Sequence, residues 1–283
     1  MTPLSPSNAI QPRKRRRWGR VVLVIFLAGI GIFCWRDFTW RRAIRQLREA
    51  GFYIAAQDAR IGERWWKAVR NDWHQLFQTG TWREQRTWYT IDPTKAGKLR
   101  NLNALAPALR RVSPYSLNLS GCTALQNVDG LKGLTALGKL NLSACPALQN
   151  VNGLKGLTAL WHLDLSDCSA LQNVDGLNGL ASLQHLNLRD CPAVQNVDAI
   201  KGLTALQGLI LDGCPTLQNV EILKRLTVLD FLRLSDCPML RDVDDLKGLT
   251  LLKVVDLRGC PKLPPEKVAA LEAALPSADI VGP

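Results

Sequence analysis

The sequence predicts an α/β fold in which residues 115–263 form a solenoid of seven stacked coils with a parallel β-sheet on the concave face. A single N-terminal transmembrane helix and a mainly helical juxtamembrane region are expected before it. Three observations lead to this prediction. Seven cysteines recur at an invariant spacing of 23 residues, leucines repeat in a fixed pattern around them, and an uncharged run over residues 21–35 follows a strongly basic tail.

Composition divides the 283-residue chain into two parts. Residues 1–111 contain 22 of the 36 basic residues and 7 of the 24 acidic ones, a net charge of +15, whereas residues 112–283 carry −3. Eight of the nine tryptophans also precede residue 90. A basic, Trp-rich segment therefore joins a slightly acidic repeat domain that is long enough to bury its own core.

The repeat over residues 137–159 shows how each coil is expected to be built. Leu140 and Leu142 alternate as in a β-strand, so both side chains point to one face. Apolar residues then follow at intervals of three: Leu148, Val151, Leu154 and Leu157. This spacing is typical of short 3₁₀ or extended turns. One coil cannot bury these side chains, whereas stacked coils can, with strands about 4.8 Å apart in a parallel sheet.

The pattern of strand leucines, three-residue spacing and 23-residue period resembles the leucine-rich-repeat family, in particular its short-repeat, internalin-like bacterial class. In that family the cysteine position is often an asparagine that turns inward and bonds to the backbone. The resemblance therefore implies a buried, weakly donating thiol in each coil. An odd number of evenly spaced cysteines also argues against a disulfide framework. The expected structural ladder is Cys122, Cys145, Cys168, Cys191, Cys214, Cys237 and Cys260.

The terminal coils of a solenoid need covering because they would otherwise expose the leucine core. We expect residues 94–114 to form an atypical first half-turn or helix at the amino end. Residues 264–283 begin with two prolines and continue with an amphipathic pattern. They are therefore expected to form a capping helix at the carboxyl end.

Residues 1–20 are expected to be a basic cytoplasmic tail and residues 21–40 an uncleaved signal anchor. Aromatic residues within 18–40 extend the uncharged run toward the membrane interface. No small-residue cleavage site follows, although a cleaved signal peptide and a buried apolar segment remain alternatives. The basic tail favours a cytoplasmic N-terminus. The chain would then be a single-pass inner-membrane protein with its repeats in the periplasm.

Residues 41–93 form the basic juxtamembrane region, and residues 60–77 within it have the apolar periodicity of an amphipathic helix. Such a helix could lie on an anionic bilayer or pack against the first repeat, and the sequence leaves both open. Basic residues interleaved with aromatic ones can also bind nucleic acid. The absence of a nucleic-acid motif and the expected anchor disfavour that partner.

Comparison of the repeats with one another indicates where a protein partner would bind. The outer path is nearly copied from coil to coil, whereas the solvent-facing positions of the inner strand vary. A mixture of aromatic, basic and acidic side chains is typical of protein-binding surfaces, with neutral drift as the alternative. The expected partner-binding residues are Trp161, His162, Asp164, His185, Asn187, Arg189, Asp212, Phe231 and Arg233.

No metal, cofactor or catalytic site is predicted. His162 and His185 should be lateral neighbours, with Asp164 close by, but three ligands of defined geometry are not evident. A cysteine at the same inward position in every coil indicates packing rather than a Cys–His nucleophile. Acidic residues such as Asp129, followed three residues later by lysine in most repeats, are expected to serve turns and N-caps rather than a cation ladder.

These observations predict a membrane-anchored binding scaffold, not an enzyme, that holds a protein partner on its concave face. A structural envelope protein that assembles with copies of itself is the alternative. An enzyme with a site within residues 41–111 is a weaker hypothesis, because no catalytic constellation is found there.

Overall fold

The computed structural model divides the chain into two compact units, residues 1–42 and 43–283. The second unit contains the sheet and the hydrophobic core described below. The structure describes four ranges of the chain: 39–54, 88–91, 98–194 and 197–283.

The expected signal anchor over residues 21–40 lies almost wholly outside the described residues, and so does the expected amphipathic helix over residues 60–77. Residues 39–49 are helical. Among the described ranges, no helix combines the length and the apolar character needed to cross a membrane.

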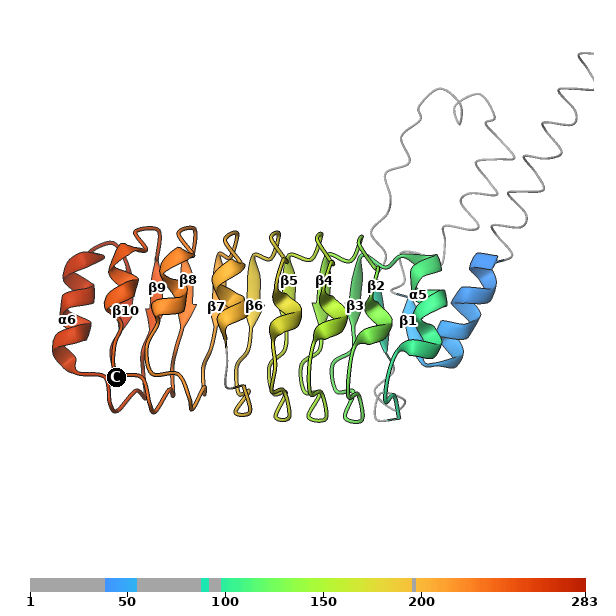
Figure 1. Cartoon of the computed structure of the whole chain (residues 1–283), viewed down its shortest axis with the longest axis horizontal. Coiled ribbons are helices and arrows are strands. Elements are labelled where there is room, and N and C mark those ends of the chain that lie inside the picture. Colours follow the sequence, from blue (N-terminus) through green and yellow to red (C-terminus); the bar gives the residue numbers. More distant parts are fainter. Residues whose placement is uncertain (1–38, 55–87, 92–97, 195–196) are drawn as a thin grey trace, which may run out of the picture. The chain divides into compact units, whose positions relative to one another are not determined.

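Ten strands of the described residues form one sheet in chain order (Figure 1). β1 pairs antiparallel with β2, and every later pairing is parallel. The strands are β1 (Phe52–Ile54), β2 (Trp88–Ile91), β3 (Ser116–Asn118), β4 (Lys139–Asn141), β5 (His162–Asp164), β6 (His185–Asn187), β7 (Gly208–Ile210), β8 (Phe231–Arg233), β9 (Val254–Asp256) and β10 (Asp279–Val281).

The strand register repeats the sequence period. Lys139 pairs with His162, and His162 pairs with His185, so each step along the sheet is 23 residues. Equivalent residues of consecutive coils therefore stand side by side. The parallel solenoid predicted from the cysteine and leucine spacing is confirmed.

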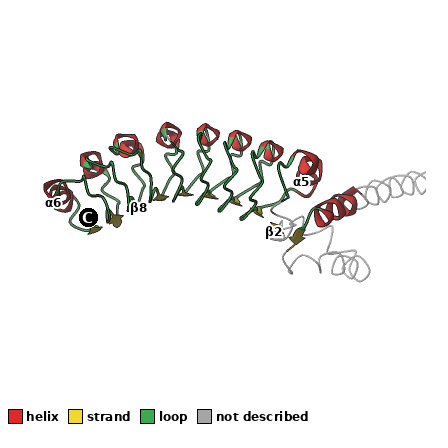
Figure 2. Ribbon diagram, turned by 90° about the horizontal axis from the view of Figure 1, so that it is seen from below, coloured by secondary structure: helices red, strands yellow, loops and turns green. Residues whose placement is uncertain are grey.

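The outer path consists of short 3₁₀ turns, as the three-residue spacing predicts. The backbone N–H of Leu154 donates to the carbonyl of Val151 (2.9 Å), and that of Leu157 donates to Leu154 (3.1 Å). Figure 2 shows the strands on the inner side of the stacked coils and these helices on the outer side. They are η2 (Asp129–Leu131), η3 (Asn152–Leu154), η4 (Asp175–Leu177), η5 (Asp198–Gly202), η6 (Glu221–Arg225) and η7 (Asp244–Gly248).

A continuous apolar interior joins the coils. Leu140, Leu142 and Leu148 of one coil are completely buried, as are the equivalent Leu163 and Leu165 of the next. Full burial of a leucine side chain stabilises a fold by about 1.5–3 kcal/mol. Because each leucine is covered partly by the neighbouring coil, this stabilisation depends on the stack and not on any single repeat.

Both ends of the array are covered by helices, but the sheet extends further than the sequence analysis predicted. At the amino end, η1 (Asn103–Leu105) leads into α5 (Ala106–Val112), and β1 and β2 lie before them within the region expected to be mainly helical. At the carboxyl end, α6 (Pro265–Ala274) is followed by β10, which pairs with β9. Strands of three or four residues contain too little alternation to be recognised outside the repeat.

Most charges on the outer path are compensated locally, as the lysine spacing predicts. Lys132 lies 2.9 Å from Asp129, Lys224 lies 2.8 Å from Glu221, and Lys247 pairs in the same way with the acid three residues before it. These side chains are largely exposed, so the pairs contribute little to stability.

The outer helices fall into two classes along the array. η2, η3 and η4 contain three residues, whereas η5, η6 and η7 contain five. The second residue of each short helix is a glycine: Gly130, Gly153 and Gly176. A Cβ at Gly153 would lie 2.0 Å from the carbonyl oxygen of Val128 in the preceding coil. The later coils carry larger residues at this position: Ala199, Ile222 and Asp245.

We predict that Gly153→Ala lowers the free energy of unfolding by about 1–3 kcal/mol, because the added methyl group forces two coils apart. Gly202→Ala is the matched control, since a Cβ at Gly202 meets nothing within 4 Å and its backbone lies outside the left-handed region. Urea denaturation followed by circular dichroism measures both. Equal stability of the two variants would show that the coils do not approach closely at Gly153.

Candidate binding surface on the inner sheet

The inner strands alternate between core and surface. In β4, β5, β6 and β8 the middle residue is buried and its two neighbours are half-buried. The side chains on either side of each buried leucine therefore form the exposed face of the sheet. This face carries most of the residues expected to bind a partner.

Aromatic and imidazole rings gather on this face around Trp161. The centroid of the Trp161 ring lies 5.8 Å from that of His162 and 6.0 Å from that of His185, and the two imidazole centroids are 5.9 Å apart. Lys139 places its ammonium group 4.4 Å from the Trp161 centroid, within cation–π range. We call Tyr115, Lys139, Trp161, His162 and His185 the aromatic cluster.

Two glycines make room for this cluster. The indole Nε1 of Trp161 donates to the Tyr115 hydroxyl (2.8 Å), a bond that spans two coils and passes over Gly138. A Cβ at Gly138 would lie 2.6 Å from the Tyr115 ring. A Cβ at Gly208 would lie 2.8 Å from Nδ1 of His185. The missing side chains on neighbouring coils therefore let the rings lie against the sheet.

The surroundings of His162 favour its neutral form. Burial lowers its pKa below the usual value, and the nearby His185 and Lys139 lower it further, while Asp164 acts in the opposite sense. Asp164 itself accepts hydrogen bonds from the backbone N–H (2.9 Å) and the hydroxyl (2.7 Å) of Ser166. Its carboxylate is thus directed to the turn after β5.

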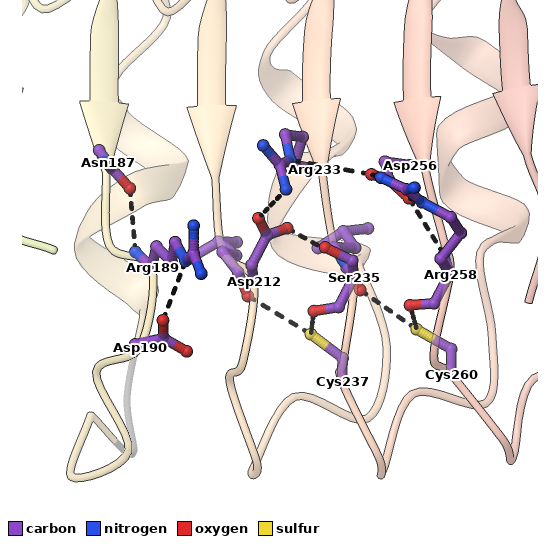
Figure 3. Close-up of polar contacts among 12 residues, drawn as sticks. Asn187, Arg189, Asp190, Asp212, Arg233, Ser235, Cys237, Asp256, Arg258 and Cys260 are labelled. Atoms are coloured by element: carbon purple, nitrogen blue, oxygen red, sulfur yellow. Dashed lines mark hydrogen bonds and ion pairs between the residues drawn. The ribbon is translucent and has the colours of Figure 1, made fainter. Parts of the chain in front are cut away.

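A second group of polar side chains lies at the carboxyl ends of β7, β8 and β9 (Figure 3). The Arg233 guanidinium stands between two carboxylates, with Nη2 2.7 Å from Asp212 and Nε 3.8 Å from Asp256. The side chains of Asp212 and Asp256 are only 5% and 8% exposed. A buried carboxylate is costly unless it is paired. Arg233 compensates both.

Further bonds complete this charged network, which we define as Asp212, Arg233, Asp256 and Arg258. Arg258 donates through Nε (2.9 Å) and Nη2 (2.6 Å) to the two oxygens of Asp256, and this hydrogen bonding lowers the pKa of that carboxyl group. The backbone N–H of Ser235 donates to Asp212 (3.0 Å). The network contains two basic and two acidic groups and is electrically balanced.

The remaining expected binding residues belong to neither group. The Asn187 side chain accepts from the backbone N–H of Arg189 (3.0 Å), and the Arg189 guanidinium pairs with the exposed Asp190 (2.9 Å). Phe231 is half-buried on β8, with Gly208 beside it on β7. The structure thus divides the expected surface into the aromatic cluster, the charged network and more isolated side chains.

The repeated cysteines are buried and unpaired by disulfides. The Cys168 thiol donates to the carbonyl of Leu142 (3.3 Å), at the strand end of the preceding coil. Burial raises the pKa of Cys168, Cys191 and Cys214 to about 12, so these thiols stay protonated, and those of Cys168 and Cys191 serve as donors. Four further thiols donate in the same way to the backbone carbonyl of the residue 26 positions earlier: Cys145, Cys191, Cys237 and Cys260.

Comparison with known proteins gives structural matches alone. No protein-family model and no curated protein matches the chain. The leucine-rich repeat domain of the type III effector XopL matches with 28% identity and a TM-score of 0.51, and the match covers 62% of this chain and 63% of that one. With the stacked 23-residue coils, this likeness shows the leucine-rich-repeat fold. The chain is a leucine-rich-repeat protein.

Two internalins of Listeria monocytogenes match less well. Internalin C2 is 25% identical, with a TM-score of 0.49 and coverage of 62% of this chain and 84% of that one. A second internalin is 18% identical, with a TM-score of 0.44 and coverage of 62% and 58%. This leucine-rich-repeat protein therefore spans less than two thirds of the length of the second internalin and of the XopL domain.

The leucine-rich-repeat protein has site residues that the sequence analysis missed. Tyr115 and Lys139 belong to the aromatic cluster, while Asp256 and Arg258 belong to the charged network. Comparison of the position just before each strand would have found Tyr115, because that column contains an aromatic residue, then glycine, then Trp161. The pairing of Asp256 depends on side-chain rotamers, and no sequence signal indicates it.

The described ranges contain no group of three His, Cys, Asp or Glu side chains that could hold a metal ion. His162 and His185 lie side by side, as expected, but Asp164 is bonded to Ser166. The chemistry available on this face of the leucine-rich-repeat protein is therefore aromatic packing, hydrogen bonding and charge.

We predict that Arg233→Met lowers the free energy of unfolding by about 2 kcal/mol, because it leaves the buried carboxylate of Asp212 without its paired cation, while Asp256 keeps Arg258. Arg189→Met is the control, since it removes only an exposed pair with Asp190 and should leave the urea midpoint unchanged. The midpoints of both variants are measured at pH 7. An unchanged midpoint for Arg233→Met would contradict the assigned compensation.

Proposed function

We propose that this leucine-rich-repeat protein is a non-enzymatic scaffold that holds a protein partner on its concave sheet. The observation that carries this proposal is the aromatic cluster. Trp161, His162 and His185 are half-buried side chains on a rigid strand surface, and the Tyr115 hydrogen bond fixes the indole. Rigid aromatic groups lose little conformational entropy on binding and are enriched at interface hot spots.

The rest of the surface supports the same location. On the outer path, most lysines are matched by an acid within the same turn, as in the Lys132–Asp129 and Lys224–Glu221 pairs. On the inner face, equivalent positions hold lysine, histidine, glycine, phenylalanine and valine in different coils. Such variation on an unchanging backbone suits recognition, because each position can change without altering the leucine core.

We further propose that residues 21–40 anchor the chain in the inner membrane, with the N-terminus in the cytoplasm and the repeats in the periplasm. The six basic residues before residue 21 support this orientation. Free cysteines are unusual in an oxidising compartment. The seven repeat cysteines are buried, and the raised pKa of thiols such as Cys168 keeps the reactive thiolate scarce.

The binding proposal predicts site-specific crosslinking in intact cells. A photoreactive phenylalanine analogue replaces Phe231 on the concave face or Lys155 on the outer path. We expect the first position to capture a distinct protein and the second to capture none. Trp161→Ala should weaken the capture about 30-fold, because truncation of an aromatic hot spot costs about 2 kcal/mol.

Thermal unfolding of the Trp161→Ala variant serves as the control for folding. Capture of the same protein from Lys155, or undiminished capture by a folded Trp161→Ala variant, would contradict the concave assignment. A crosslinked product that contains only copies of this chain would instead support the self-assembling alternative and overturn the proposal of a separate partner.

The topology proposal predicts the behaviour of a reporter enzyme fused after Pro283. A phosphatase that folds only outside the cytoplasm should be active in this fusion, whereas a fluorescent protein that fails to mature there should be dark. Removal of residues 21–35 should reverse both results. Activity of the phosphatase only after this removal would overturn the orientation.

A further inference from the structure

Three basic side chains surround Trp161 on β4, β5 and β6. Lys139 lies over the indole at 4.4 Å, and the imidazoles of His162 and His185 lie against its other sides. Consecutive coils contribute these groups at equivalent strand positions, since Lys139 pairs with His162 and His162 pairs with His185. The parallel register therefore concentrates three nitrogen bases around one aromatic surface.

Positive charges on these three side chains repel one another. Both His185 and Lys139 disfavour the protonated form of His162, and the acidic group that favours it, Asp164, acts more weakly and is bonded to Ser166. On the far side of His185, β7 presents Gly208 and Ile210, which carry no charge. An anionic group placed beside the two imidazoles would relieve this repulsion and favour their protonation.

The carboxyl-terminal part of the same face offers no comparable site. Asp212, Arg233, Asp256 and Arg258 neutralise one another within the charged network. Lys253 likewise pairs with Asp230 at 3.1 Å. On the described sheet, a neighbouring pair of imidazoles is found at the aromatic cluster.

We propose that the aromatic cluster binds an acidic segment of the partner protein, in which a carboxylate lies next to an aromatic side chain. The carboxylate contacts His162 and His185, and the neighbouring aromatic side chain packs on Trp161. This inference rests on the concave binding proposed above and names the chemistry of the partner there. Because the bound carboxylate raises the imidazole pKa values, binding is strongest at low pH and weakens as pH rises through the pKa values of the complex.

Titration of the full-length protein with two short peptides tests the proposal. The probe is acetyl-Gly-Glu-Phe-Glu-Gly-amide, and its control replaces both glutamates by glutamine. The protein contains three histidines, of which His74 is not among the described residues, and ring resonances of histidine-labelled protein report each imidazole separately. We expect the acidic peptide to shift the His162 and His185 resonances and to raise their pKa values, and the amide peptide to leave both resonances unchanged.

The affinity of the acidic peptide should fall about tenfold between pH 6 and pH 8, with each imidazolium–carboxylate pair contributing about threefold. The double variant His162→Gln/His185→Gln should lose this pH dependence and bind the two peptides equally. Lys155→Gln, a charge removal on the outer path, should behave as the parent protein. Thermal midpoints of all variants verify folding.

Equal binding of the acidic and the amide peptide, or unchanged imidazole pKa values, overturns the proposal. So does a pH dependence that survives in the folded double variant. If crosslinking from Phe231 still captured a partner, these results would not contradict the proposed binding on the concave sheet. The two proposals can therefore fail separately.

Discussion

The close contact between consecutive coils is the constraint on which this molecule depends. A strand of three residues and a turn of three to five residues cannot bury leucines alone. The side chains of Leu140 and Leu163 are completely buried because each coil lies against the next. The same contact brings Gly153 close to the backbone of the preceding coil. It also allows thiol hydrogen bonds such as the one from Cys168 to the carbonyl of Leu142.

This constraint determines where variation is tolerated. A residue that points into the stack contacts both neighbouring coils, so a change there affects two interfaces. A residue on the inner strand surface contacts its lateral neighbours and solvent. Trp161 and Phe231 can therefore occupy positions that hold glycine or valine elsewhere in the array without altering the interior. The stacked coils therefore produce both the rigid backbone and the variable surface.

The two polar groups of the inner face differ in what they offer a partner. In the charged network, Arg233 is occupied by Asp212 and Asp256, whose burial requires the cation. Its side chain contributes to the fold as well as to the surface. Among the described residues, the buried carboxylates of Asp212 and Asp256 both belong to the charged network, whereas the rings of the aromatic cluster are arranged around Trp161. We therefore expect a partner to gain more binding free energy at the aromatic cluster than at the charged network.

The sequence by itself determined the period, the inward leucines, the buried cysteines and the adjacency of His162 and His185, because a repeat of fixed length places equivalent residues side by side. Only the tertiary structure decided which side chains within that face contact each other. The Trp161–Tyr115 bond spans two coils across Gly138, and Arg233 joins carboxylates from two other coils. Such contacts depend on rotamers and on the space that neighbouring coils leave, and the periodicity of a single chain does not encode either.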